Sequence, residues 1–231
     1  EIVKQAIVEL LSTKQLIDKK VLVTAGGTQE PLDPVRYLGN YSTGKMGYNL
    51  ARVAQVGGAD VTLVSAPTNL NKPNGVDLVK VETAEEMYQQ VIELQAEQDI
   101  IIMAAAVADY KPKNKEVQKM KKNTGPLKLE LDRTKDILFE LGQVRKDEQI
   151  LVGFAAETED LLTNAQQKLK EKQADLIIAN DVSSSDIGFA SDNNQVTLIS
   201  EHEQQEIEKA DKLKIAIQIF NYIMKIAEDK E

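Results

Sequence analysis

The segment GNYSTGKM, residues 39–46, resembles a phosphate-binding loop in its residue types and spacing. It reads G-x-x-x-x-G-K, but Met46 stands where a P-loop has the Ser or Thr that holds Mg²⁺. A P-loop also joins a buried strand directly to a helix, whereas fourteen residues, two of them prolines, separate Ala25 from Asn40 here. The sequence therefore argues against a P-loop.

The end of this segment can still bind an anion. Ser42, Thr43 and Gly44 stand where a helical pattern begins, and the first N–H groups of a helix attract negative charge. Ser42 or Thr43 could equally be only an N-cap, which satisfies one of those N–H groups without any ligand. Both interpretations remain open at this stage.

Two further segments place polar or small residues at the end of a buried strand. The run AAAVADY brings Asp109 just past the carboxyl end of the strand in residues 99–103, where open α/β sheets bind ligands. TAGGT follows the first strand but lacks G-x-G-x-x-G, and the next strand ends in SAPT without an acidic residue for a ribose. A nicotinamide-dependent oxidoreductase is thus a weaker alternative.

Lysines are the remaining candidates for binding phosphates. KMKK, residues 119–122, lies in an irregular loop of residues 111–125 that we expect to act as a lid over a triphosphate. Lys168 and Lys172 are four residues apart on one predicted helix, so they share a face. Each group taken by itself is also typical of a solvated surface.

The composition excludes several classes of chemistry. The chain has 231 residues without Cys, and its one His, His202, lies in a polar run, so thiol catalysis, disulfides and a Ser-His-Asp hydrolase are disfavoured. The net charge of −9 argues against nucleic-acid or anionic-membrane partners. No apolar run is long enough to span a membrane and no signal peptide is visible, so a cytoplasmic protein is expected.

The elements that must position these residues alternate between strand and helix. Buried strands are predicted near residues 21–25, 59–66, 76–82, 99–103, 149–157 and 174–181, and helices near 44–56, 83–98, 134–146 and 160–173. A last helix is expected from about residue 206 to 227. This order predicts a Rossmann-like, doubly wound α/β fold with a mostly parallel sheet.

Two segments do not follow this alternation of strand and helix. Residues 126–132 (PLKLELD) and 193–200 (NNQVTLIS) alternate apolar and polar side chains, which is typical of half-exposed antiparallel strands. We predict that they pair into a small sheet that packs against its copy in a homodimer, with Leu129 and Leu198 on the shared face. Residues 110–132 and 182–200 would form this flap and dimerisation region, within a domain of residues 20–231 that follows an N-terminal junction helix in residues 1–19.

The motifs together resemble phosphopantothenoylcysteine synthetase of the bacterial, CTP-dependent type. The resemblance extends from about Lys20 to the last helix and rests on TAGGTQEPLDPVRYLGNYSTGKMG, AAAVADY, KMKK, GFAAET, ANDV and GFASDNN. In many bacteria this domain follows a flavin-dependent decarboxylase in one polypeptide. The opening residues resemble the junction helix of such fusions, and a start at Glu1 is consistent with a domain excised from a fusion with an upstream decarboxylase; no flavin is expected in this segment.

What the resemblance implies is a ligase of coenzyme A synthesis. The carboxylate of 4′-phosphopantothenate attacks the α-phosphorus of CTP, which gives an acyl-cytidylate and pyrophosphate. The amine of L-cysteine then attacks the acyl carbon and releases CMP. Mg²⁺ would be carried by CTP, and no protein metal ligand is implied.

The site residues transfer by resemblance to numbered positions of this chain. The catalytic residues would be Arg36, Asn40 and Lys119, and the substrate phosphate would lie at Ser42, Thr43, Gly44 and Lys45. The nucleotide would contact Met103, Ala104, Ala105, Asp109, Lys119, Lys135, Asp136, Ile137, Leu138, Phe154, Lys168 and Lys172. The chain departs from the family pattern at TKDI, where Lys135 replaces a frequent Pro, and at Met103, where some relatives have a smaller residue. A non-catalytic nucleotide-binding regulatory module stays open as a second alternative.

Overall fold

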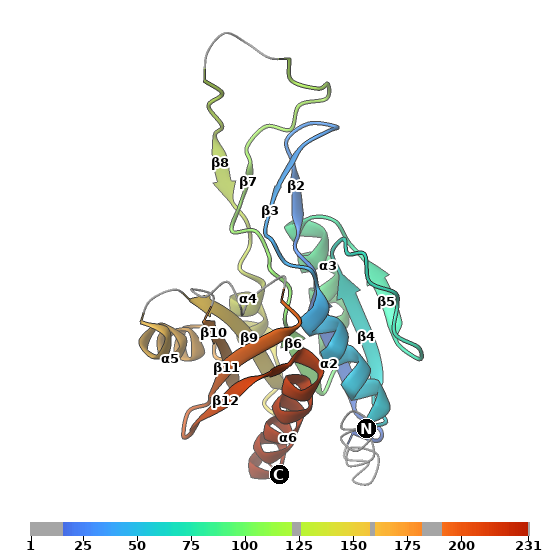
Figure 1. The fold of residues 1–231 in the computed structure, drawn as a ribbon, viewed down its shortest axis with the longest axis vertical. Helices are drawn as coiled ribbons and strands as arrows, with labels where there is room; N and C mark the ends of the chain where they lie inside the picture. Colours follow the sequence, from blue (N-terminus) through green and yellow to red (C-terminus); the bar gives the residue numbers. More distant parts are fainter. Residues whose placement is uncertain (1–15, 122–125, 158–159, 182–190, 231) are drawn as a thin grey trace.

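An eight-stranded sheet forms the centre of the computed structural model, which describes residues 16–121, 126–157, 160–181 and 191–230 (Figure 1). Six strands are parallel, in the order β5 (Asp77–Lys80), β4 (Asp60–Ser65), β1 (Lys20–Ala25), β6 (Ile100–Met103), β9 (Ile150–Glu157), β10 (Leu176–Asp181). The antiparallel strands β11 (Asn193–Ile199) and β12 (Gln204–Asp211) complete one edge. The predicted α/β class with a mostly parallel sheet is confirmed.

Helices cover both faces of this sheet. On one face, α2 (Lys45–Val56) and α6 (Lys212–Lys230) pack against the buried Val and Ile side chains of the central strands. On the other face lie α3 (Ala84–Leu94), which continues into the short 3₁₀ helix η1 (Gln95–Glu97), α4 (Ile137–Val144) and α5 (Leu161–Glu171). Because both faces are covered, the strands are nearly continuous runs of apolar residues, as parallel sheets require.

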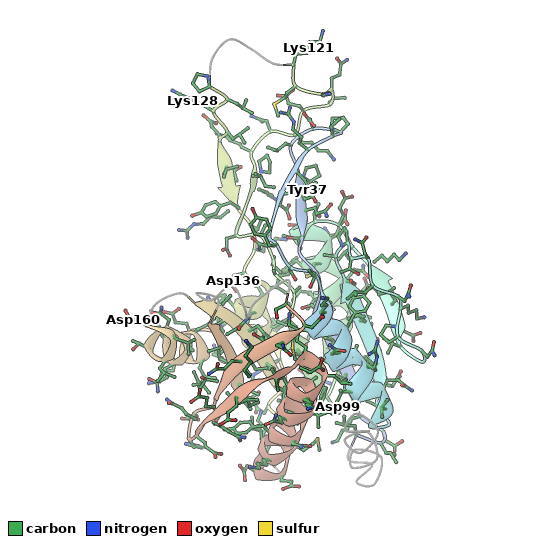
Figure 2. All side chains as sticks on the ribbon, in the orientation of Figure 1. Tyr37, Asp99, Lys121, Lys128, Asp136 and Asp160 are labelled. Atoms are coloured by element: carbon green, nitrogen blue, oxygen red, sulfur yellow. The ribbon has the colours of Figure 1, made fainter. Side chains whose placement is uncertain are left out.

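An arm projects from the end of the sheet where the parallel strands terminate (Figure 1). It consists of two hairpins, β2 (Gln29–Pro31) with β3 (Tyr37–Gly39) and β7 (Tyr110–Pro112) with β8 (Leu131–Arg133), together with the described part of the chain between β7 and β8. Tyr37, Lys121 and Lys128 mark its length in Figure 2. The two hairpins are joined by backbone hydrogen bonds such as that from Glu116 N–H to the Leu32 carbonyl (2.9 Å).

Two sequence-based predictions about the elements are wrong, and the structure also decides which residue caps α2, a point that the sequence left open. The alternating segments do not pair with each other, because β11 joins the main sheet between β10 and β12, whereas β8 pairs with β7 in the arm. The last helix begins at Lys212 rather than near residue 206, because residues 204–211 extend the sheet as β12. Neither Ser42 nor Thr43 caps α2, since its N-cap is Gly44. The predicted junction helix in residues 1–19 lies almost wholly outside the described residues.

Candidate active site at the switch point of the sheet

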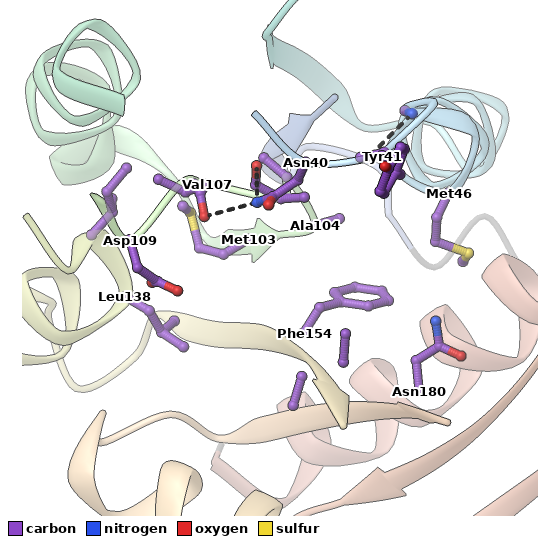
Figure 3. Close-up of a pocket in the computed structure, with 18 of the residues that line it drawn as sticks. Asn40, Tyr41, Met46, Met103, Ala104, Val107, Asp109, Leu138, Phe154 and Asn180 are labelled. Carbon is purple, nitrogen blue, oxygen red and sulfur yellow. Dashed lines mark hydrogen bonds between the residues drawn. The ribbon is translucent and has the colours of Figure 1, made fainter. Parts of the chain in front are cut away.

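A cavity of about 460 Å³ opens at the carboxyl ends of the central strands (Figure 3). The parallel strand order runs outward in both directions from β1 and β6, so the cavity lies at the switch point where open α/β folds bind ligands. All but two of the predicted site residues line it: Asn40, Ser42, Thr43, Gly44, Lys45, Met103, Ala104, Ala105, Asp109, Lys135, Asp136, Ile137, Leu138, Phe154, Lys168 and Lys172.

Two threonines fix the loop that follows β6 to the loop that follows β1. The Ala105 N–H donates to Thr24 Oγ1 (3.1 Å), and the Ala108 N–H donates to Thr28 Oγ1 (2.9 Å). Backbone hydrogen bonds join the same loops, from Ala106 N–H to the Gly26 carbonyl (2.8 Å) and from Thr28 N–H to the Ala106 carbonyl (3.2 Å). The backbone along one wall of the cavity is therefore held in place before any ligand binds.

Asn40 is fixed to the same wall through its amide nitrogen. Asn40 Nδ2 donates to the carbonyls of Ala106 (3.2 Å) and Val107 (3.3 Å) (Figure 3). Two carbonyl acceptors define the amide orientation, because the reversed amide would set oxygen against oxygen. The oxygen of this side chain is thus the group left to interact with a ligand. An Asn amide can also donate to a substrate oxygen, but here the amide nitrogen of Asn40 is used by the loop after β6.

Glycines allow α2 to begin close to the cavity. Gly44 has a positive φ of 78°, and a Cβ there would lie 2.6 Å from the Thr68 side chain. A Cβ at Gly47 would lie 2.6 Å from Ala25 Cβ, so the helix packs directly on β1. Both positions require Gly, and together they direct the N–H groups of the first turn of α2 toward the cavity.

The lysines at the α4 and α5 side of the cavity are held by neighbouring acids. Lys172 Nζ lies 2.8 Å from Asp136 Oδ2, and Asp136 also caps α4 by accepting from the Phe139 N–H (3.0 Å). Lys135 Nζ lies 2.9 Å from Glu85 Oε1 and 3.9 Å from the centre of the Tyr88 ring. The hydrogen bond with Glu85 raises the pKa of Lys135, so this ammonium stays charged throughout the physiological range.

Several lining residues escaped the sequence-based prediction. Lys212, Asn180 and Asn194 come from α6, β10 and β11, and Thr134, Val107 and Tyr41 from connecting loops. Asn180 lies beside Met46 and Phe154 in Figure 3. Lys212 is the first residue of α6, whereas the predicted helix began near residue 206, and Asn194 belongs to the GFASDNN motif, to which no site role was assigned. Asn180 belongs to the ANDV motif, which supported the family resemblance but did not indicate a role for Asn180 in the site.

Arg36 and Lys119 are the two predicted catalytic residues that do not line the cavity. Both lie on the arm, where the Arg36 guanidinium pairs with Asp33 (2.6 Å) and also donates to the Met120 carbonyl (3.3 Å). Lys119 is exposed on the neighbouring segment. Within one copy of the described chain, the structure therefore separates these cations from the cavity.

Two searches of the described residues concern other kinds of site. No helix there is long and apolar enough to cross a membrane. In the same residues, no three His, Cys, Asp or Glu side chains group together in a way that could hold a metal ion. His202 is highly exposed, with a side-chain exposure of 88%, as expected for a surface residue.

The sequence matches the family described as "DNA/pantothenate metabolism flavoprotein C-terminal domain" over residues 16–227. The chain belongs to this family. The resemblance found in the motifs is confirmed at this level, and the match includes every predicted site residue.

Relatives of this family show the same domain in a larger protein. The coenzyme A biosynthesis bifunctional protein CoaBC of Bacillus subtilis (strain 168) is 46% identical over 207 residues, which cover 89% of this chain and 51% of that protein. The chain thus spans about half the length of these curated relatives.

Solved structures agree with the fold. A crystal structure of the C-terminal domain of the bifunctional protein CoaBC superposes with a TM-score of 0.80 at 42% identity and covers 94% of this chain and 99% of that one. Cab2, solved as a mutant in complex with phosphopantothenate-cysteine, superposes with a TM-score of 0.74 at 19% identity, over 100% of this chain and 95% of that one. At that identity, Cab2 supports the fold alone.

Proposed function

We propose that this chain is a phosphopantothenate–cysteine ligase that uses CTP. The carboxylate oxygen of 4′-phosphopantothenate attacks the α-phosphorus of CTP, the Pα–O–Pβ bond breaks, and pyrophosphate leaves. The amine of L-cysteine attacks the acyl carbon of the acyl-cytidylate, loses a proton, and displaces CMP. The products are 4′-phosphopantothenoylcysteine, CMP and pyrophosphate. Mg²⁺ would enter with CTP, because a triphosphate binds Mg²⁺ through its own oxygens.

The cavity at the switch point carries this proposal. It is lined by the N-terminus of α2, by five lysines and by a backbone wall that hydrogen bonds hold in place; the lysines are Lys45, Lys135, Lys168, Lys172 and Lys212. Activation of a carboxylate by a nucleoside triphosphate brings together two anions, so the site must chiefly neutralise charge and align the reacting groups. This chemistry requires no thiol or imidazole side chain, so the absence of Cys and the exposure of the one His are compatible with it.

The nucleotide is assigned to the part of the cavity between β6, β9 and α4. Phe154 and Leu138 offer apolar surface, and the Ala residues after Met103 allow a ligand to approach the backbone closely. Lys168 lies on α5 and Lys172 is the C-cap of that helix, and both would face the phosphates. Asp109 is exposed at the edge of the cavity, where its carboxylate can accept from ribose or base N–H and O–H groups.

Asn40 is assigned to the reacting centre. Its amide nitrogen holds the loop after β6, so its oxygen is the group that would accept from the incoming amine of cysteine. An uncharged acceptor suits this position, since a carboxylate there would repel the acyl-cytidylate. The phosphate of phosphopantothenate is assigned to Ser42, Thr43, Gly44 and Lys45.

Arg36 and Lys119 take part in this proposal through a homodimer. Both residues lie on the arm, whose exposed apolar side chains need a partner, and we assign that partner to a second copy of the chain. The upstream flavin-dependent decarboxylase is proposed from the length of the bifunctional relatives.

One assay tests the function as a whole. Purified protein is mixed with CTP, Mg²⁺, 4′-phosphopantothenate and L-cysteine, and pyrophosphate and the amide product are measured together. Stoichiometric release of pyrophosphate that requires phosphopantothenate is expected, and omission of cysteine should leave acyl-cytidylate on the enzyme. Absence of pyrophosphate release would favour a regulatory nucleotide-binding module. A rise in melting temperature with NADPH but not with CTP would favour an oxidoreductase.

A further inference from the structure

Lys212 is a lysine almost wholly removed from solvent that nevertheless lines the cavity. Its residue exposure is 4%, and it is the first residue of α6. Its backbone N–H donates to the Asp192 carbonyl (3.0 Å), which fixes the start of the helix against the segment before β11. Burial penalises the charged form of an ammonium, so an anionic ligand in this cavity would favour the charged form of Lys212.

One cation and one carboxylate act on the Lys212 ammonium. Lys45, on the first turn of α2, lies close enough to repel it, and Asp192 is the carboxylate that attracts it. Asp192 is itself shared with Lys45, whose Nζ lies 2.6 Å from Asp192 Oδ1. Burial, followed by repulsion from Lys45, lowers the pKa of Lys212 to about 8.

Two buried asparagines lie at the same end of the cavity. Asn180 and Asn194 are 9% and 3% exposed, and both line the cavity with Lys212. Within the described part of the chain, the Oδ1 atom of each has no hydrogen-bond partner. Buried polar atoms without partners are rare, so this end of the cavity has hydrogen-bonding capacity that a ligand and its bound water would use.

We propose that Lys212 binds a phosphate group of a substrate at the α2 end of the cavity, together with Lys45 and the first turn of α2. The inference rests on the proposed function for the identity of the substrate, and it adds a residue from the last helix to that site. Two phosphates could occupy the position, the 4′-phosphate of phosphopantothenate or the terminal phosphates of CTP. Their shared chemistry, a dianionic phosphate, is what the subsite recognises.

A measurable consequence is that binding takes up a proton. Near pH 8 about half of the Lys212 side chains are neutral in the free protein, and a bound phosphate favours the ammonium. The protein should therefore gain up to one proton when the ligand binds, and affinity should fall by up to about tenfold per pH unit above pH 8. Asp192 keeps its charge over this range, because the hydrogen bond with Lys45 holds the pKa of its carboxyl below the usual value.

Isothermal titration calorimetry of the intact chain in two buffers of different ionisation enthalpy tests the proposal. CTP with Mg²⁺ and 4′-phosphopantothenate are titrated separately at pH 7, 8 and 9. Lys212→Met removes the ammonium at similar size and should weaken one of the two ligands about 30-fold or more and abolish its proton uptake. Lys212→Arg should restore binding without proton uptake, because a guanidinium does not titrate here. Lys214→Met, on the same helix but outside the cavity, is the control.

The ligand that loses affinity identifies which phosphate occupies the subsite. Equal proton uptake and affinity in wild type and Lys212→Met for both ligands would overturn the proposal. If Lys212→Met fails to fold, the contrast between wild type and Lys212→Arg decides, since identical proton uptake in these two also contradicts the role of Lys212. Binding is measured without turnover, so a wild type that binds with proton uptake but forms no product refutes the ligase and leaves the subsite standing.

Discussion

The sheet edge and the arm hold their functional side chains in different ways. At the sheet edge, Asn40, Thr24 and Thr28 fix the backbone of neighbouring loops, and fully buried strands support them from below. On the arm, the chain is mostly exposed, and one buried carboxylate, Asp33, joins its two hairpins. The cavity at the sheet edge is therefore lined by residues of one copy of the chain, whereas the arm holds Arg36 and Lys119 away from that cavity.

The apolar surface of the arm explains this difference. Large hydrophobic side chains are more than one third exposed along its length: Val35, Tyr37, Tyr110, Val117, Leu127, Leu129 and Leu131. A run of this kind marks a protein–protein contact more often than a solvated surface. In the proposed dimer, the sheet would supply the cavity and the arm would supply the surface that brings two copies together.

The largest expected effect is a difference between two leucines that were predicted from the sequence to lie on one dimer face. Leu198 is fully buried in the core between the sheet and α6, so Leu198→Glu should destabilise the fold by more than about 4 kcal/mol and yield aggregate. Leu129 is 40% exposed on the arm, so Leu129→Glu should fold and give a monomer. Thermal denaturation and sedimentation velocity measure both outcomes.

Wild type is the reference for this pair. It should sediment at about twice the chain mass of 25.6 kDa at micromolar concentration. Lys128→Glu, a neighbouring exposed residue of the arm with a polar side chain, should leave the dimer intact. A dimeric Leu129→Glu variant would contradict the assignment of the arm to the dimer.

Next in size is the loss of ligation in Asn40→Asp, at the sheet edge. The carboxylate cannot donate to the Ala106 and Val107 carbonyls, and it adds charge beside an anionic intermediate. Product formation should fall by about 10³-fold or more, as it does when one group that stabilises a transition state is lost. The melting temperature should drop only slightly, and Asn74→Asp in an exposed turn should be neutral in both assays. Near-normal turnover would remove Asn40 from the reacting centre.

The sequence was a good guide to the sheet and a poor one to the arm, for a physical reason. Buried strands such as residues 21–25 and 100–103 consist mostly of apolar residues, which indicates that both faces of the strand are covered. Their positions and the switch point could therefore be predicted. The segment of residues 193–200 alternates in the same way as residues 126–132, but the former packs in the core and the latter lies on the arm. Alternation indicates that one face of a strand is apolar, but it does not indicate which element covers that face.

Individual residues of the cavity could be predicted only where a sequence motif directly follows a strand. Lys212 and Asn194 enter it through the antiparallel edge of the sheet, a long-range arrangement that no local spacing encodes. Asn40 was identified, but the direction of its hydrogen bonds was not, because that depends on two carbonyls sixty-six and sixty-seven residues away.

An intermediate effect is expected for Lys119→Gln, on the arm. If the arm brings this ammonium to the triphosphate of the partner copy, it stabilises the negative charge that leaves with pyrophosphate. Acyl-cytidylate formation should slow by about 10²-fold with unchanged folding, as measured by single-turnover quench with labelled CTP. Lys115→Gln on the same arm is the matched control. Normal activation followed by slow amide formation would assign Lys119 to the second step instead.

The smallest effect concerns Asp33, which acts through its neighbours on the arm. Its buried carboxylate accepts from the Arg36 guanidinium (2.6 Å) and from the N–H groups of Val35, Arg36 and Met120 (2.8, 2.8 and 3.1 Å). These bonds tie the β2–β3 turn to the segment that carries Lys119. They also hold the pKa of Asp33 well below its usual range.

Asp33→Asn should therefore loosen the arm and leave the sheet intact. Turnover should fall about tenfold through the Lys119-dependent activation step, and hydrogen exchange at the Met120 N–H should accelerate while exchange in β1 and β6 stays slow. Because the pKa of Asp33 is lowered in the folded protein, its carboxylate contributes fully to the stability of the arm above about pH 4. That stability is lost only as the pH falls further. In the wild type, the protection of the Met120 N–H should therefore not change through titration of Asp33 between pH 5 and 8. The double variant Asp33→Asn with Lys119→Gln should be no slower than Lys119→Gln alone if Asp33 acts by positioning Lys119. Additive losses would show that the carboxylate supports a second function of the arm, through Arg36.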